Sequence, residues 1–339
     1  MKIGVVEKPG VLKIADRDVP KVTNPDDVLI KVKRVGICGS DIHIYHGKNP
    51  FATYPRVWGH EFVGEVVEIG SVVNGIQKGA HVVVEPIIYC GKCYACRQGR
   101  GNICETLKVM GVHIDGGCQE YIVVPAANVH VLPTPLSWDE AVLIEPFTIG
   151  AQAVYRGNVL PGDFVLVMGA GTIGLTALQM AKLAGATVIV TDLVPAKLDY
   201  AKSRGADFTI NAKDEDLTAR VREITGGMGP NVTIDAVCIK TSFEQAVEIT
   251  SAAGRVVELS FNEIKSEIAP VNIIKKELTI CGSRLQTKRF PVVIDCLKQG
   301  KIPLEGFITK IYPIADMVEA FDFVDKNNAS VRKVVISFD

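Results

Sequence analysis

Four cysteines gather in one short stretch of the chain. The segment YCGKCYACRQGRGNICE places them in a C-x2-C-x2-C-x7-C spacing, at Cys90, Cys93, Cys96 and Cys104. Four thiolates on one loop can close a tetrahedral zinc site, and such a site keeps no open position for chemistry. The spacing therefore predicts a structural zinc lobe over about residues 88–106.

Two other uses of these thiols remain open, an iron–sulfur centre and thiols without a ligand. A bacterial iron–sulfur run has C-x2-C-x2-C-x3-C followed by proline, usually with a second such run. Here the last gap is seven residues, Glu105 follows, and there is no second run. The N-terminal MKIGVVEKPG lacks the apolar region of a signal peptide. We expect a cytoplasmic, reduced protein, in which the cysteines do not form disulfides.

The composition bounds the class of protein. A chain of 339 residues suggests about two domains. Hydrophobic residues make up 47% and charged residues 22%, which is ordinary for a globular protein. The net charge of −1 argues against nucleic acid or an anionic membrane as a partner. No apolar run reaches the roughly 18 residues of a membrane helix. A small molecule is the expected partner.

The texture of the chain changes near residue 150. Residues 1–150 contain short β-branched runs broken by Gly and Pro, such as Val28–Val35, Glu65–Ile69 and His81–Val84, which predict a β-rich domain. Residues 151–285 alternate strand-like runs with helical segments, which predicts an α/β domain with a doubly wound parallel sheet. Its six predicted strands are 164–168, 187–191, 208–210, 232–237, 255–259 and 278–283.

Two helices of this second domain are predicted at Ile173–Leu183 and Ser242–Ala252. Residues 286–339 then form a third segment, with a helix near Phe290–Leu297 and a final strand at 331–338. We expect this segment to return to the first domain.

The motif GAGTIG at 169–174 lies between a predicted strand and a predicted helix. In a dinucleotide-binding turn the first glycine makes the bend, the second admits the pyrophosphate, and the third packs helix against strand. An acidic residue at the next strand end, here Asp192, binds the ribose hydroxyls and disfavours a 2′-phosphate. We therefore expect NAD rather than NADP. The candidate nucleotide-binding residues are Gly169, Gly171, Thr172, Ile173, Gly174 and Asp192.

Several further segments carry a resemblance to a known family. These are GICGSDIHIY at 36–45, PRVWGHEFVGEVVEIG with its GHE at 59–61, the CGKCYACRQGRGNIC lobe, IEPF at 144–147, and GAGTIG. Over its whole length the chain resembles the zinc-dependent medium-chain alcohol and polyol dehydrogenases. The resemblance implies a GroES-like catalytic domain at the N-terminus, a Rossmann NAD-binding domain after it, and one catalytic plus one structural zinc per chain.

The resemblance also implies site residues. Cys38 and His60 would ligate the catalytic zinc. Taken singly, Cys38 is more often a small buried residue, and His60 is more often a histidine that forms hydrogen bonds within the protein. The third ligand is open between Glu61 and Glu145, either directly or through water; many alcohol dehydrogenases have cysteine at the second position. Glu145 alone reads as the acid of a helix N-terminus. Such a site activates a substrate hydroxyl for hydride transfer to the nicotinamide.

A proton relay follows from the same resemblance. Ser40 would lie beside the reacting oxygen, and His43 would exchange the proton with solvent, since a histidine titrates near neutral pH. An exposed loop histidine is the alternative for His43.

The substrate is the least constrained part. The stretches YPRVWGHE, MGVHIDGGCQEYIVVPAANVH, LIEPFTIGA and SRLQTKRFPVVID resemble bacterial hexonate 5-dehydrogenases and the related starvation-sensing proteins. L-gulonate, oxidised to D-fructuronate, is the favoured substrate; L-galactonate, sorbitol or another polyol, and L-threonine are the alternatives. Arg284 is the candidate carboxylate contact, and the cations of Lys288 and Arg289 follow it. A non-catalytic NAD-binding sensor is the alternative from another class.

The oligomeric state is expected from the same resemblance. A homodimer formed by the edge strand at 278–283, or a homotetramer, would be usual, and an exposed strand edge needs to be covered.

Overall fold

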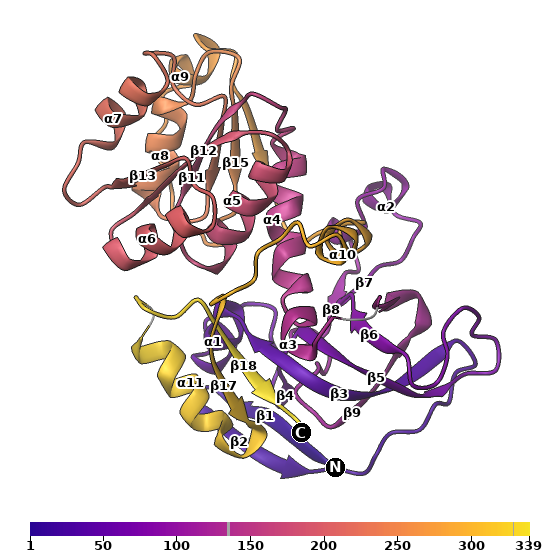
Figure 1. Cartoon of the computed structure of the whole chain (residues 1–339). Helices are drawn as coiled ribbons and strands as arrows, with labels where there is room; N and C mark the ends of the chain where they lie inside the picture. The colour runs from indigo at the N-terminus through magenta and orange to yellow at the C-terminus, as the bar shows by residue number, and fades with distance from the viewer. Residues whose placement is uncertain (134–135, 328) are drawn as a thin grey trace. The chain divides into compact units, whose positions relative to one another are not determined.

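The computed structural model describes residues 1–133, 136–327 and 329–339. The chain forms two compact units. The first unit comprises Met1–Glu145, Phe290–Gly300 and Leu304–Asp339, so it contains both termini (Figure 1). The second unit comprises Pro146–Arg289 and Lys301–Pro303. Among the described residues, no helix has the length and apolar character needed to cross a membrane.

The first unit is built on β-sheets. Its main sheet has the order β10-β6-β5-β3-β18-β17, with β9 also paired to β3. A second sheet has the order β2-β1-β4, and β7 pairs with β8. The strands are β1 (Lys2–Lys8), β2 (Val11–Asp16), β3 (Asp27–Ile37), β4 (Arg56–Val57), β5 (Glu61–Ile69), β6 (His81–Val84), β7 (Ile87–Ile88), β8 (Lys108–Val109), β9 (Tyr121–Pro125), β10 (Val129–Val131), β17 (Ile308–Pro313) and β18 (Lys333–Ser337).

Short helices connect these strands. They are α1 (Gly39–Tyr45), α2 (Tyr94–Arg97), η1 (Gly101–Ile103), η2 (Ala126–Asn128), α3 (Trp138–Ala141), α10 (Phe290–Lys298), η3 (Ile314–Asp316) and α11 (Met317–Lys326). Helix α4 (Ile144–Arg156) begins in the first unit and continues in the second. β3 is central because its β-branched residues are fully buried, including Val28, Ile30 and Val32.

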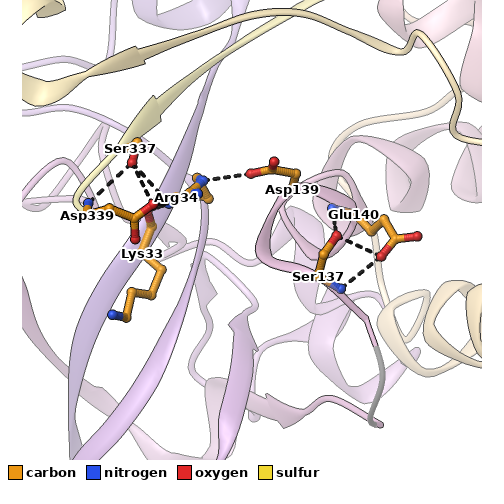
Figure 2. A network of polar contacts seen from close by, with 7 residues as sticks. All are labelled: Lys33, Arg34, Ser137, Asp139, Glu140, Ser337 and Asp339. Atoms are coloured by element: carbon orange, nitrogen blue, oxygen red, sulfur yellow. Dashed lines mark hydrogen bonds and ion pairs between the residues drawn. The ribbon is translucent and has the colours of Figure 1, made fainter.

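The C-terminal strand is fastened into the centre of the first unit. β18, yellow in Figure 1, pairs antiparallel with the indigo β3, with Val335 opposite Gly36. Figure 2 shows the polar network at its end: the Arg34 guanidinium lies 2.7 Å from Asp139 and 2.6 Å from Asp339. The same guanidinium donates to the Ser337 hydroxyl at 3.1 Å. Arg34 is the residue opposite Ser337 in the pairing of β3 with β18, so these contacts link the end of β18 to β3.

The second unit is a six-stranded parallel sheet with the order β13-β12-β11-β14-β15-β16. The strand order reverses between β11 and β14, which is the position where open α/β sheets bind their ligands. The strands are β11 (Phe164–Met168), β12 (Thr187–Asp192), β13 (Phe208–Asn211), β14 (Val232–Asp235), β15 (Arg255–Glu258) and β16 (Thr279–Gly282). The helices are α5 (Thr172–Leu183), α6 (Pro195–Ser203), α7 (Leu217–Ile224), α8 (Lys240–Ile249) and α9 (Pro270–Ile274).

The predicted fold class is confirmed, and the differences lie at the ends of elements. β14 ends at Asp235, two residues before the predicted end, because the Asp235 carboxylate accepts the backbone N–H groups of Val237 and Cys238 and turns the chain. Helix α8 begins at Lys240 rather than Ser242, because the Ser242 hydroxyl accepts the backbone N–H of Ile239 and caps the helix.

Candidate active site

The cysteine lobe brings its four thiols together. One ligand atom from each of Cys90, Cys93, Cys96 and Cys104 lies within 4.8 Å of the others. Cys93 Sγ and Cys104 Sγ are 3.9 Å apart. Zn–S bonds of about 2.3 Å in a tetrahedron place the sulfurs about 3.8 Å apart, so this spacing fits one zinc ion. A cluster of several iron atoms needs a wider set of thiolates.

Backbone N–H groups prepare the lobe for a cation. The N–H of Cys93 donates to Cys90 Sγ, and the N–H groups of Cys90 and Thr106 donate to Cys104 Sγ, at 3.3 to 3.4 Å. The N–H of Cys90 is the largest cause that lowers the pKa of Cys104 to about 6. Burial and the neighbouring thiols raise the pKa of Cys96 to about 12. The lobe therefore favours the thiolate of Cys104, and binding of a metal would favour deprotonation of Cys96 as well.

A second cluster of metal-binding side chains lies in the same unit. Ligand atoms of Cys38, His60 and Glu61 lie within 4.8 Å of one another. Cys38 caps the N-terminus of α1, and His60 directly precedes β5, which begins at Glu61. His60 is 8% exposed and Glu61 is 1% exposed. Together they offer one thiolate, one imidazole and one carboxylate, which is a donor set that fits zinc with a fourth position left open.

A buried aspartate lies beside the histidine. Asp41 is fully buried, and its Oδ1 lies 3.6 Å from His60 Nδ1 while its Oδ2 accepts the Cys38 N–H at 2.8 Å. At 3.6 Å the two atoms form no hydrogen bond. Burial lowers the pKa of His60, but Asp41 and Cys38 together outweigh burial and hold that pKa well above its usual range. Asp41 was not among the predicted site residues, although it stands in the same GICGSDIH motif.

The two candidate glutamates have different surroundings. Lys333 Nζ donates to both Glu61 carboxylate oxygens at 2.7 Å. Glu145, in the first turn of α4, is 3% exposed and does not belong to the set of atoms within 4.8 Å. Burial raises the pKa of Glu145 to about 7, with His60 acting against this rise and Glu61 adding to it. Of the two glutamates, Glu61 is the one whose carboxylate lies within reach of Cys38 and His60, and Glu145 is close enough for the charges of His60 and Glu61 to affect its pKa.

The proposed proton relay is on helix α1. Ser40 is partly buried and His43 is exposed on the same helix that follows Cys38. A serine on the inner side and a solvent-facing histidine are compatible with proton exchange between the site and water.

The second unit provides a phosphate-binding turn. Gly169 has a φ of +94°, a conformation that favours glycine, and a Cβ on Gly174 would collide with the Gly169 carbonyl oxygen. Gly171 is the N-cap of α5, and no side chain caps that helix end. Its first N–H groups, including those of Thr172 and Ile173, therefore lie where a helix N-terminus binds phosphate.

Asp192 is held at the end of β12 beside this turn. Its Oδ2 accepts the Ala170 N–H at 2.8 Å, and its Oδ1 accepts the Val194 N–H at 3.0 Å. A carboxylate fixed at this place fits two ribose hydroxyls and repels a 2′-phosphate, so the turn and the strand end fit NAD.

Replacing Cys93 by Ser tests the lobe. The variant leaves three thiolates for the ion, and we expect it to lose one zinc per chain and about 3 kcal/mol or more of stability. Metal analysis and thermal unfolding measure both. Cys296→Ser, which lies outside both clusters, is the control and is expected to keep the full zinc content. A full zinc content and an unchanged melting temperature in Cys93→Ser contradict the lobe.

Glu145 gives the metal-free protein a specific pH dependence. Its pKa is about 7 in the folded chain and near 4.5 when unfolded, so between these values the folded state binds more protons. Stability contributed by Glu145 is therefore present below pH 4.5 and is lost as the pH rises through about 7, by on the order of 3 kcal/mol. Urea unfolding of chelator-treated protein from pH 5 to 8 measures it. Glu145→Gln should flatten this part of the curve, and parallel curves for the two proteins contradict the prediction.

Comparison with known proteins identifies the family. A model described as the alcohol dehydrogenase GroES-like domain matches residues 24–134, and one described as zinc-binding dehydrogenase matches residues 172–299. The chain is 42% identical over 340 residues to the starvation-sensing protein RspB of Escherichia coli K12, covering 100% of this chain and 99% of that protein. It is 38% identical over 340 residues, with the same coverage, to the L-galactonate-5-dehydrogenase of that strain.

A solved structure agrees over the same length. The rspB alcohol dehydrogenase of E. coli CFT073, crystallised with NADH, matches with a TM-score of 0.95 and 41% identity, covering 100% of this chain and 99% of that one. NAD and zinc are accordingly the cofactors expected for this protein, and the predicted enzyme class is confirmed. The chain belongs to the zinc-binding alcohol dehydrogenase family, and it is an oxidoreductase acting on CH–OH groups.

Proposed function

We propose that the protein oxidises a secondary alcohol of a hexonate at C5 with NAD, with L-gulonate as the first candidate and L-galactonate as the second. The observation that carries this proposal is the match along the entire chain to an L-galactonate-5-dehydrogenase. Glu145 supports it, because a glutamate at this position is typical of the branch of the family that acts on polyols, sugar acids and threonine.

The residues of the first unit would work on the hydroxyl. Cys38, His60 and Glu61 would hold zinc, which lowers the pKa of a hydroxyl bound to it. Ser40 would accept the proton from the substrate hydroxyl and pass it toward His43, which exchanges it with water.

The residues of the second unit would hold the hydride acceptor. The turn at Gly169–Gly174 and the N-terminus of α5 would bind the pyrophosphate, and Asp192 would bind the ribose.

Arg284 is the proposed contact for the substrate carboxylate. It follows β16, it is half-buried, and its guanidinium lies 4.9 Å from the centre of the Phe261 ring. This partial burial lowers the pKa of Arg284. A partly desolvated guanidinium binds a carboxylate through two parallel hydrogen bonds. Lys288 is exposed, and the Arg289 guanidinium is already engaged, because its Nε donates to the Thr287 carbonyl oxygen at 2.9 Å.

A substrate panel tests the reaction. Zinc-replete protein is assayed for NAD reduction with L-gulonate, L-galactonate, L-idonate, sorbitol and L-threonine, with Cys38→Ser as the inactive control. We expect one hexonate to reach a kcat/KM of about 10⁴ M⁻¹s⁻¹ or more. A higher value for sorbitol or L-threonine than for every hexonate contradicts the proposal.

Arg284→Ala should raise the KM for the best hexonate by about 10- to 100-fold, because a hydrogen bond to a charged group contributes about 1.5–3 kcal/mol. The KM for a neutral polyol should change far less. Arg289→Ala, which removes a neighbouring cation, is the matched control and should leave both KM values nearly unchanged. Equal effects of Arg284→Ala on the hexonate and the polyol would remove Arg284 from carboxylate binding.

We also propose a homodimer, or a tetramer built from such dimers. β16 is an edge strand of the six-stranded sheet, and α9 exposes Val271 (59%) and Ile274 (72%) in the same unit. An open strand edge with exposed apolar side chains favours pairing with another copy. Sedimentation equilibrium should give at least twice the 36.6 kDa of one chain, and a monomer at micromolar concentration contradicts the proposal.

A further inference from the structure

A buried lysine faces the candidate metal site from the far end of the chain. Lys333 begins β18 and its side chain is 3% exposed. Its Nζ donates to both carboxylate oxygens of Glu61 at 2.7 Å and to the Ile37 carbonyl oxygen at 3.2 Å. Lysine is almost never fully buried unless it is paired, so this contact is a built part of the site rather than a surface ion pair.

The sheet leaves room for this contact at one glycine. Glu61 on β5 is opposite Gly36 on β3, and Gly36 is opposite Val335 on β18. A Cβ on Gly36 would collide with Glu61 Oε2. The Glu61 side chain therefore lies over the middle strand at Gly36 and reaches Lys333 on the strand beyond it. Any larger residue at position 36 would close this route.

The charges around Lys333 explain why an ammonium group is tolerated there. Its Nζ is paired with both oxygens of the buried Glu61 carboxylate, so the two charges compensate each other. The positive charge of Lys333 also opposes the binding of a divalent cation beside Glu61, so a lysine at this position needs a functional explanation.

We propose that Lys333 is a positioning residue that holds Glu61 beside the metal and limits the negative charge that Glu61 offers to it. This inference rests on the ligand set in the proposed function. An ionised carboxylate has about four acceptor sites, and Lys333 occupies one on each oxygen. Glu61 is thereby kept as a weak, exchangeable ligand, and the fourth metal position stays accessible to the substrate. Without Lys333, both carboxylate oxygens of Glu61 would be available to the metal, and the second oxygen could take the fourth position.

The test compares Lys333→Met and Lys333→Arg with the wild type, using cobalt in place of zinc. The visible absorption spectrum of cobalt reports the number and kind of ligands, and competition with a chelator gives the metal affinity. We expect Lys333→Met to shift the cobalt spectrum, to bind metal about tenfold more tightly, and to lose about tenfold in kcat with a smaller change in KM. Glu61→Gln combined with Lys333→Met should abolish the gain in affinity. An arginine at position 333 can still donate two hydrogen bonds to Glu61. The affinity of Lys333→Arg for cobalt should therefore equal that of the wild type or fall below it.

The controls separate the possible failures. Lys326→Met removes an exposed lysine that pairs with Asp322 on α11, and it should match the wild type in every measurement. Cys38→Ser should lose the part of the cobalt spectrum that belongs to this site and keep the part that belongs to the cysteine lobe. If Cys38→Ser and the wild type have the same spectrum, the proposed metal site itself is wrong.

Two results overturn the inference while leaving the metal site in place. One is a Lys333→Met variant with the same cobalt spectrum and the same metal affinity as the wild type, which would mean that Lys333 does not influence how Glu61 binds the metal. The other is a tighter affinity in Lys333→Arg, which decides the matter even where Lys333→Met does not fold.

Discussion

The compensation of buried charge is the constraint on which the first unit depends. Asp41, His60, Glu61, Glu145 and Lys333 are each less than 9% exposed, and they stand among apolar strands where an unpaired charge costs several kcal/mol. Neighbours compensate part of this charge: Asp41 accepts the Cys38 backbone N–H and lies 3.6 Å from His60, and Lys333 is paired with Glu61. The neighbouring strands β5, β3 and β18 carry Glu61, Gly36 and Lys333 respectively, so the register of these strands sets the distance between Glu61 and Lys333. The Arg34 network links the end of β18 to β3.

In the second unit, backbone groups rather than side chains would compensate the charge of the cofactor phosphates. The proposed pyrophosphate site is a turn in which Gly169 and Gly174 allow a close approach of strand and helix, and the dipole of α5 would supply the positive potential. Asp192 would contribute a charged side chain, and two backbone N–H groups hold it in place. Backbone donors lose no side-chain entropy when a nucleotide binds, so the turn can exchange the oxidised and reduced cofactor without rearranging side chains.

Features that are local in the sequence could be predicted, and features that depend on strand register could not. The cysteine spacing, GAGTIG with Asp192, and the six strands of the second unit are each contained in a short segment with its own periodicity or turn chemistry. Lys333 is separated from Glu61 by 272 positions, and the role of Gly36 exists only once β3 lies between β5 and β18. One signal was present: a lysine that opens the apolar run KVVIS is out of place unless it has a buried partner. The ends of β14 and α8 were missed because side chains of Asp235 and Ser242 decide them.

The two candidate metal sites differ in their donor atoms, and this difference suits one of them to a structural role and the other to a catalytic role. In the lobe, four thiolates can satisfy zinc completely, and backbone N–H groups already stabilise the charge on Cys104. A saturated ion binds no substrate, so its free energy of binding goes into the fold of a lobe that has only short helices and a two-stranded sheet. The proposed site at Cys38 mixes donors: Cys38 is the N-cap of α1, and His60 and Glu61 lie together at the start of β5. As an exchangeable ligand paired with Lys333, Glu61 would give this site the property that the lobe excludes, which is a position that can change occupant during turnover.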